Sequence, residues 1–302
     1  MNMTRQTITP HLWYEKEAKE AADFYVSAFG RNSKINNLNT MDDTPSGSVD
    51  IVNFEIWEHE FVAMSAGPYF ELNPSISFMV NFDPSQDKDA RERIDQVWEK
   101  LSTGGKPLMP LDRYDFSERY GWIQDKYGVS WQLIYTNPEG EERPLILPSL
   151  LFVGELCGKA EEATDHYLSI FPDSQRGALV HYPAGMAPEE EGTVMFTDFK
   201  LAGQWFAAMD SAQTHEFAFN EAISFIVKCK DQEEIDTYWD RLSAVPEAEQ
   251  CGWIKDRFGI SWQIVPDNMG ELMGKNPEKT MPVMLQMKKI VIADLIEAGE
   301  GQ

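Results

Sequence analysis

The chain has 302 residues, which fits two domains of ordinary size, and its 42% hydrophobic content is that of a folded globular protein. A formal net charge of −24 argues against nucleic-acid binding, which needs clustered lysine and arginine, and against an anionic membrane surface. The sequence has no apolar run of the roughly 18 residues that a membrane span needs, and no apolar signal segment near its start, so we expect no membrane partner.

The first predicted elements are a strand over 8–14 and a helix over 17–29. Apolar residues of this helix recur at steps of three and four, which gives one apolar face: Ala18, Ala21, Ala22, Tyr25 and Phe29. Strands are then expected near 33–40, 48–57 and 60–66. The same order starts again with a strand over 76–82, a helix over 89–101, and strands near 106–110, 120–124 and 129–135.

The most informative pattern is an internal repeat, in which residues 121–132 return as residues 252–263. The two segments read GWIQDKYGVSWQ and GWIKDRFGISWQ, which are identical at eight of twelve positions. Shorter matches join 22–29 to 164–171, 61–64 to 206–209, and 76–80 to 223–227. Self-similarity of this density predicts two copies of one domain. A polar linker rich in proline and glycine lies over 136–144, so we expect domains at 1–143 and 144–302.

Each copy is itself a pair of βαβββ units. Such a unit places a helix on one face of a curved antiparallel sheet and leaves the concave face for a partner unit or a ligand. Residues 125–128 suit a turn, in which Gly128 supplies a positive φ before the last strand. We therefore interpret Asp125 and its copy Asp256 as turn formers and not as catalysts.

Paired βαβββ units that end in this Gly-Trp…Asp…Gly…Ser-Trp-Gln motif resemble the PhnB-like family, often labelled 3-demethylubiquinone-9 3-methyltransferase. That family belongs to the vicinal oxygen chelate superfamily, with glyoxalase I, bleomycin-resistance proteins and extradiol dioxygenases. The resemblance covers nearly the whole chain, once per copy. It implies an α+β fold of two tandem domains, each with curved antiparallel sheets around a central cavity, packed as a pseudo-dimer within one chain. Residues 284–293 resemble the C-terminal helix common in the family.

The resemblance also implies where a metal would bind. Metal-dependent relatives hold a divalent ion with four inward-facing His, Glu or Gln side chains, from the first and a late strand of each unit. These positions correspond to Pro10, Met64, Ser75 and Gln132 in the first copy, and to Pro148, Met209, Ala222 and Gln263 in the second. Only the glutamines suit, since proline offers no side-chain ligand and a thioether prefers soft metals. We therefore expect no metal and no cofactor.

His11 lies next to one of these positions. Strand alternation turns it to the face opposite Pro10 and Leu12, although a slip of one residue would reverse this. By the same alternation, we expect a concave surface that is mostly apolar with a few small hydrogen-bonding groups, the usual composition of a small-molecule pocket. The candidate ligand-binding residues are Leu12, Met64, Ser75, Ser77, Met79, Trp122, Ser130, Gln132, Met209, Ser224, Trp253 and Gln263. The alternative for Met64 and Met79 is that they only fill the core.

The two copies differ before the Gly-Trp motif. The first carries a longer segment over 106–120, the arm, which is rich in polar and aromatic residues, whereas the second has only residues 245–251. Arms of this kind can cover a pocket or a partner subunit. Our hypothesis is that the first copy keeps the working site and that the second is largely a structural partner.

These patterns favour a protein that binds a small, partly apolar molecule in a metal-free cavity, similar to bleomycin-resistance proteins. The alternative is a metal-dependent lyase or dioxygenase of the same superfamily; catalytic residues stay unknown. We do not expect methyl transfer, because no glycine-rich turn between strand and helix could hold an adenosyl cofactor. A further homodimer is left open. The cysteines Cys157, Cys229 and Cys251 have no framework spacing, so we expect free thiols and a cytoplasmic location.

Overall fold

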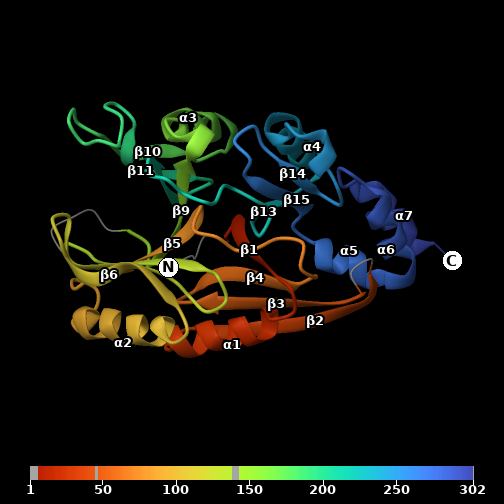
Figure 1. Cartoon of the computed structure of the whole chain (residues 1–302). Coiled ribbons are helices and arrows are strands. Elements are labelled where there is room, and N and C mark those ends of the chain that lie inside the picture. The colour runs from red at the N-terminus through yellow and green to blue at the C-terminus, as the bar shows by residue number, and fades with distance from the viewer. Residues whose placement is uncertain (1–5, 45–46, 138–142, 302) are drawn as a thin grey trace. The chain divides into compact units, whose positions relative to one another are not determined.

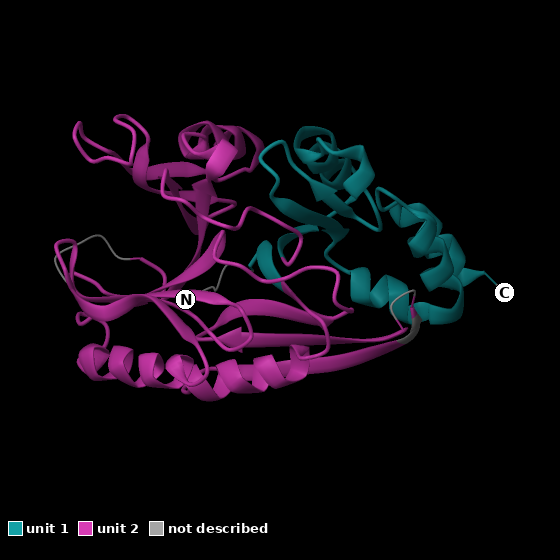
Figure 2. Cartoon of the chain, viewed as in Figure 1, with its two compact units in different colours: residues 1–11, 223–302 teal, residues 12–222 magenta. Residues whose placement is uncertain are grey.

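A computed structural model describes residues 6–44, 47–137 and 143–301. They form two compact units, shown in Figure 2. Unit 1 combines the N-terminal segment up to His11 with residues 223–302, and unit 2 comprises residues 12–222. Residues of both sequence copies therefore occur in each unit, although the first copy contributes only its N-terminal segment to unit 1.

The elements follow the predicted order, and the α+β class is confirmed. The first copy contains β1 (Ile8–Tyr14), α1 (Ala18–Phe29), β2 (Lys34–Thr44), β3 (Gly47–Ile56), β4 (His59–Ser65), β5 (Ile76–Phe82), α2 (Ala90–Ser102), β6 (Lys106–Tyr114), β7 (Ser117–Gln124) and β8 (Ser130–Tyr135). The second contains β9 (Ile146–Val153), α3 (Ala160–Ile170), β10 (Gln175–His181), β11 (Val194–Leu201), β12 (Gln204–Ser211), β13 (Ile223–Cys229), α4 (Gln232–Leu242), β14 (Trp253–Lys255) and β15 (Ser261–Pro266). Three helices follow: α5 (Met269–Lys275), α6 (Pro277–Gln286) and α7 (Ile292–Glu300).

An eight-stranded sheet organises unit 2, in the order β10-β11-β12-β9-β5-β8-β7-β6 (Figure 1). One half is the βαβββ unit of β5–β8 from the first copy, and the other is that of β9–β12 from the second. Within each half the first and last strands pair in parallel, whereas β5 and β9 pair antiparallel, with Ser77 opposite Ser149. The two copies are thus joined by a pseudo-twofold relation between β5 and β9.

Large buried side chains cover the helix side of this sheet. Phe78 and Trp131 lie on neighbouring strands with ring centroids 5.4 Å apart, and Phe199 stacks with Phe206 at 5.9 Å. All four are at most 2% exposed. Because side chains alternate along a strand, Ser77 and Gln132 point to the face opposite these aromatic side chains, where both are buried.

The turn motif is built identically in both copies. Asp125 Oδ2 accepts from Trp131 Nε1 at 2.8 Å, and Oδ1 accepts from the backbone N–H groups of Tyr127 and Val129. Asp256 accepts from Trp262 Nε1 at 2.9 Å and from two equivalent backbone N–H groups. The carboxylates are buried and fully engaged, so they act as turn formers.

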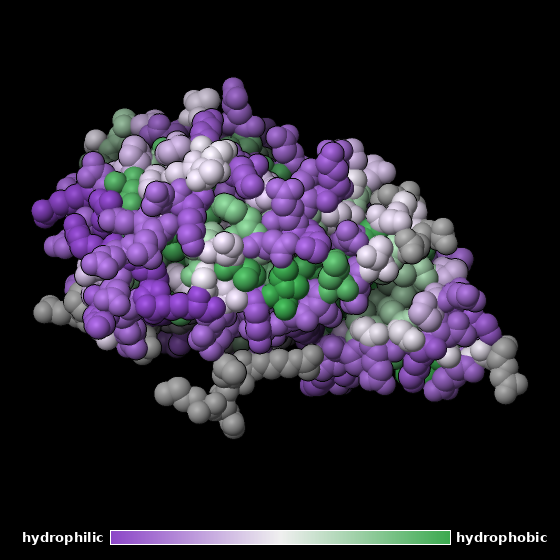
Figure 3. Space-filling model, turned by 90° about the horizontal axis from the view of Figure 1, so that it is seen from below, coloured by the Kyte–Doolittle hydropathy of each residue, from purple (hydrophilic) through white to green (hydrophobic). Residues whose placement is uncertain are grey.

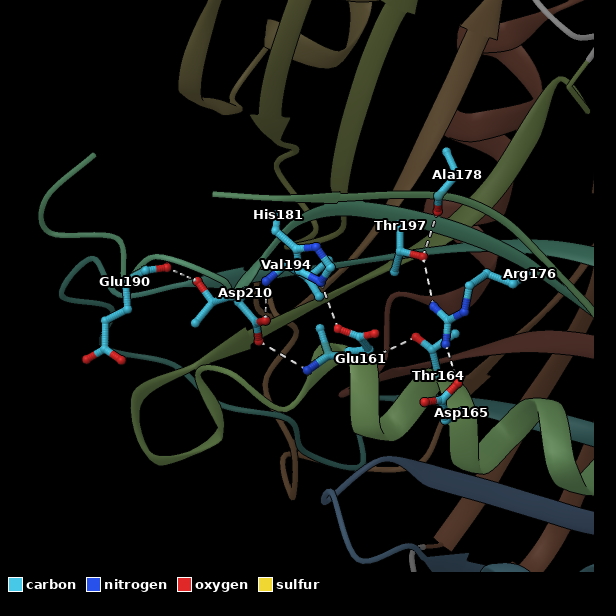
Figure 4. Close-up of polar contacts among 12 residues, drawn as sticks. Glu161, Thr164, Asp165, Arg176, Ala178, His181, Glu190, Val194, Thr197 and Asp210 are labelled. Carbon is cyan, nitrogen blue, oxygen red and sulfur yellow. Dashed lines mark hydrogen bonds and ion pairs between the residues drawn. The ribbon is translucent and has the colours of Figure 1, made fainter. Parts of the chain in front are cut away.

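Polar contacts attach α3 to the strands beneath it (Figure 4). Arg176 on β10 pairs with Asp165 on α3, and His181 Nε2 lies 2.8 Å from Glu161 Oε2. Asp210 accepts from the backbone N–H of Ala160 at 3.1 Å and so fixes the start of α3. His181 is the last residue of strand β10 and is exposed.

Unit 1 contains a shortened half, β13-α4-β14-β15, which has one strand fewer than the βαβββ units of unit 2; β13 pairs in parallel with β15, and β14 pairs antiparallel with β15. The single C-terminal helix expected over 284–293 is wrong: α6 ends at Gln286 and α7 begins at Ile292. Between them lies an extended segment, residues 287–291, which we call the strap. Backbone N–H groups of Cys251 and Gly252 donate to the carbonyls of Met287 and Lys288 at 2.9 and 2.7 Å. The strap takes the place that β6 occupies beside β7.

None of the helices in the described part of the chain is long and apolar enough to cross a membrane. The face drawn in Figure 3 exposes mainly hydrophilic residues, with hydrophobic ones in small groups between them. Large hydrophobic side chains that are exposed include Tyr69 and Phe116, at 65% and 63%. Phe116 belongs to the arm, so this part of the arm lies on the surface of unit 2.

Candidate functional site

The face of the eight-stranded sheet that bears Ser77 and Gln132 carries a buried polar network, which we call the polar face. Gln132 Nε2 on β8 donates to Ser77 Oγ on β5 at 2.8 Å, and the Tyr120 hydroxyl on β7 donates to Gln132 Oε1 at 2.8 Å. Both ends of the Gln132 amide are therefore engaged by neighbouring strands. Trp122 Nε1 donates to Ser130 Oγ at 2.7 Å, which completes a second pair on the same face.

One member of the polar face has no partner. Ser149 lies on β9 directly opposite Ser77 and is 1% exposed. Its Oγ makes no hydrogen bond with any described residue. A buried hydroxyl left without a partner costs about 1–3 kcal/mol, so Ser149 is the position at which a bound molecule gains most from supplying an acceptor or donor.

Apolar side chains border this network. Met79, Leu147 and Ala207 form a buried cluster against which Phe196 and Trp205 pack. Met209 on β12 lies beside Leu151 and is half-buried on the same face. The polar face is therefore bordered by aliphatic and aromatic side chains.

A charged pair closes one side of the apolar border. Arg143 Nε donates to Asp198 Oδ2 at 2.8 Å, and the guanidinium lies 4.2 Å from the centroid of the Trp205 ring. Asp198 Oδ1 also accepts from the backbone N–H of Ala178 at the bulge of β10. The carboxylate is thus held by one cation and one backbone group, which suits a structural ion pair.

Unit 1 carries a matching face built from the equivalent positions. Gln263 Nε2 on β15 donates to Ser224 Oγ on β13 at 2.9 Å, as Gln132 does to Ser77. His11 Nδ1 lies 3.4 Å from Ser224 Oγ, and the His11 ring meets Trp253 edge-on with centroids 5.4 Å apart. His11 therefore occupies the position that Ser149 has in unit 2.

The candidate residues from the sequence divide between these two faces. The sheet of unit 2 brings together Ser75, Ser77, Met79, Trp122, Ser130, Gln132 and Met209. Ser224, Trp253 and Gln263 lie together in unit 1. Met79 belongs to a buried apolar cluster, which agrees with the core-filling alternative. Met64 is half-buried on β4, which is not a strand of the eight-stranded sheet.

The register of the first strands needs a correction of one residue. His11 contacts Ser224, so Leu12, the next residue of the extended strand, points to the opposite face. Likewise Pro148 lies opposite Phe78, which places it on the helix side, and Ser149 takes the expected position. The contacts between neighbouring strands determine this register. The sequence does not reveal it, because β1 and β9 carry apolar residues on both faces.

Sequence reasoning missed Ser149 and Tyr120 as members of the site. Ser149 follows Pro148 in an otherwise apolar strand, so the signal available was one hydroxyl in the run ILPSLLFV. Tyr120 was seen only as part of the arm. Tyr120 precedes Gly121, and the residue at the same position in the second copy is Cys251. This tyrosine-to-cysteine difference between the copies was the available signal that the faces of the two units are not alike.

Neither face offers a donor set that fits a divalent cation. The strand positions that the family resemblance assigns to metal ligands, with the first strand corrected by one residue, carry Ser75, Gln132, Ser149 and Met209 in unit 2, which are two hydroxyls, an amide and a thioether. Unit 1 adds one imidazole, His11, beside Ser224 and Gln263. Within the described residues no three His, Cys, Asp or Glu side chains gather as a metal site. Zinc, iron and manganese sites need carboxylates, thiolates or several imidazoles, so we derive no chemistry through a metal.

A family model described as 3-demethylubiquinone-9 3-methyltransferase matches the chain twice, over residues 6–134 and 144–265. The chain belongs to this family. The PhnB protein from Bacillus cereus, described under the same family label, is 34% identical over 43% of this chain and 100% of that chain, with a TM-score of 0.39. Glyoxalase I from Zea mays covers 87% of this chain and 95% of that chain at 12% identity, with a TM-score of 0.55. That likeness shows the glyoxalase type of fold for the tandem chain. No curated protein matches the chain.

Proposed function

We propose that the chain binds a small, partly apolar molecule on the polar face of the eight-stranded sheet, without a metal ion. The observation that carries the proposal is Ser149 Oγ, which is buried and without a hydrogen-bond partner among the described residues. It lies beside a network that is otherwise satisfied and within an apolar border. A ligand with one acceptor oxygen would pair with Ser149, while its apolar part would pack against Met79, Leu147 and Met209.

The proposed site draws on both copies: Ser149, Leu147 and Met209 come from the second, and the arm comes from the first. The arm supplies Tyr120, whose hydroxyl holds Gln132. The rings of Tyr114 and Phe116 in turn contact Tyr120, and they border a surface hollow of about 500 Å³. We propose that this hollow is the approach to the polar face, because Tyr120, which bonds Gln132, contacts the two rings that line it.

The competing function is a metal-dependent lyase or dioxygenase. One observation favours it: His11 shares a face with Gln263, so that one imidazole and one amide lie close together. The donor set is otherwise poor. Elemental analysis of protein purified without chelators separates the two functions, because the enzyme requires near-stoichiometric metal that is lost in a His11→Phe variant.

The binding proposal is tested with acetophenone, which combines an apolar ring with one carbonyl acceptor. In protein labelled with ¹³C at the methionine methyl groups, we expect acetophenone to shift Met79 and Met209, assigned by Met→Leu variants. Ser149→Ala should weaken binding about fivefold, the equivalent of one hydrogen bond of ~1 kcal/mol. Ser27→Ala, on the exposed side of α1, is the matched control and should change nothing. Absence of methionine shifts at about 10 mM probe, a concentration at which ligands this small bind when a site exists, would contradict the proposal.

A cytoplasmic location and a homodimer of the whole chain remain predictions. The described cysteines are free thiols, with Cys229 buried and the other two half-buried. Burial raises the pKa of the Cys229 thiol to about 12, which makes it unreactive at neutral pH.

A further inference from the structure

The matching face of unit 1 differs from the polar face in which of its donors and acceptors have partners. Ser224 Oγ accepts from Gln263 Nε2 and lies 3.4 Å from Nδ1 of His11, and we assign its own proton to a hydrogen bond donated to that nitrogen. An imidazole that accepts at Nδ1 carries its own proton on Nε2. None of the described residues accepts from this Nε2–H. With this assignment, His11 has a hydrogen-bond donor available at Nε2.

Gln263 presents an acceptor on the same face. In unit 2 the equivalent oxygen, Gln132 Oε1, is capped by the Tyr120 hydroxyl. In unit 1 the equivalent of Tyr120 is Cys251, whose thiol donates to the carbonyl of Met284 in α6 and not to the glutamine. Gln263 Oε1 has no hydrogen-bond partner among the described residues, and the side chain is half-buried.

Two further groups complete the face. Ser261 lies opposite Ser224 and is 1% exposed, and its Oγ has no partner among the described residues. In unit 2 the equivalent Ser130 is paired with Trp122. Trp253 lies opposite Gln263 and presents its ring to His11. Lys255, opposite Ser261, is already engaged in another interaction.

We propose that this face of unit 1 is a second site, which recognises a neutral planar amide. His11 Nε2–H donates to the amide carbonyl oxygen, Gln263 Oε1 accepts from the amide N–H, and the indole of Trp253 contacts the apolar part of the ligand. Burial lowers the pKa of His11 to about 3, so the ring stays uncharged at neutral pH and does not favour a carboxylate over an amide. The inference rests on the proposed function in one respect, that both faces bind small molecules.

The test compares benzamide with acetophenone and benzoate, which share the ring but lack the amide N–H. Binding is followed by the ¹⁵N signal of the His11 side chain. We expect benzamide to shift the His11 signal and to bind about fivefold more tightly than acetophenone, because it makes one additional hydrogen bond. Gln263→Leu should abolish this preference.

Gln132→Leu is the matched control in unit 2 and should leave benzamide binding at His11 unchanged. The inference is overturned if benzoate binds at His11 as well as benzamide does, or if Gln263→Leu keeps the preference. Should Gln263→Leu fail to fold by near-ultraviolet circular dichroism, Gln263→Met gives the same readout with a similar volume. Acetophenone shifts at Met79 and Met209 report the proposed function separately, so failure of one site is distinguishable from failure of the other.

Discussion

The repeated Asp–Trp pair shows how single residues determine this fold. A carboxylate accepts from an indole six positions later and from two backbone N–H groups between them. The tryptophan is thereby fixed against Phe78 and the α1 residues Tyr25 and Phe29. The motif is thus a structural signature, and its presence in both copies says nothing about catalysis.

Replacement of Asp125 by asparagine should destabilise the protein. The side-chain amide of the Asp125→Asn variant cannot accept from Trp131 and from both backbone N–H groups at once, because one of its ends is a donor. We expect a loss of about 1–3 kcal/mol in the free energy of unfolding, measured by urea denaturation above pH 7, where the Asp125 carboxyl with its pKa of about 6 is ionised. Asp256→Asn should behave similarly. An unchanged midpoint in both variants would show that the carboxylates do not hold the turns.

The buried side chains of His11 and Asp125 should change the free energy of unfolding in opposite directions as the pH rises. Burial lowers the pKa of His11 from 6.5 to about 3, so its contribution is complete above pH 6.5 and is lost as the pH falls towards 3. Burial raises the pKa of Asp125 from 3.8 to about 6, so its contribution is complete below pH 3.8 and is lost as the pH rises through 6.

His11→Phe isolates the first of these effects. Between pH 6.5 and 3 the parent should lose up to about 1.4 kcal/mol per pH unit through His11, and the variant should lack that slope. Urea denaturation at several pH values measures it. Equal slopes in parent and variant would mean that His11 titrates at its ordinary pKa and is not buried in the folded chain.

At the scale of elements, a different segment lies beside the Gly-Trp motif in each copy: the arm in the first and the strap in the second. Gly121 allows β6 to approach β7, since a Cβ there would lie 2.5 Å from the Trp98 ring and 3.0 Å from Leu111 Cα. Gly252, at a φ of 89°, would place a Cβ 3.2 Å from Ile290 Cγ1 of the strap. The glycine of the Gly-Trp motif therefore leaves room for the Trp98 ring and Leu111 in the first copy, and for the Ile264 carbonyl oxygen and Ile290 of the strap in the second.

Ile290→Ala tests the strap. Ile290 is fully buried with Leu272 and Leu295, which anchor the C-terminal helices. Loss of its side chain should cost about 2–4 kcal/mol in unfolding free energy and should increase amide exchange at Cys251 and Gly252. Ile292→Ala, at a partly buried position of α7, is the control and should cost less. Protection at Cys251 and Gly252 equal to that of the parent would show that the strap does not hold this edge.

Most elements could be predicted from the sequence, because two independent signals agree: the hydrophobic periodicity of each element and the internal repeat. The strap could not be predicted: residues 284–293 have helical composition, whereas residues 287–291 leave the helix and accept from the backbone N–H groups of Cys251 and Gly252. The site was predicted in part. Gln132 and Ser77 followed from alternation, whereas Ser149 and His11 required the true register of β9 and β1.

At the scale of the molecule, the boundary between the copies that we predict at 143/144 falls within unit 2. Its sheet joins β5 of the first copy to β9 of the second. Since this pairing is antiparallel and related by a pseudo-twofold axis, residues 1–143 alone should pair through β5 with a second copy of themselves. Light scattering should therefore give a dimer mass for that fragment, and a 1:1 complex after mixing with 144–302. A folded monomer as stable as the parent would contradict this prediction.

The measurement that tests the central claim most directly is an intermolecular NOE experiment with acetophenone and ¹³C-methyl-methionine protein. The binding account predicts contacts from the probe to the Met79 and Met209 methyl groups, reduced in Ser149→Ala. Contacts confined to methionines of unit 1, or no contacts while His11-dependent metal is present at one equivalent, would contradict it.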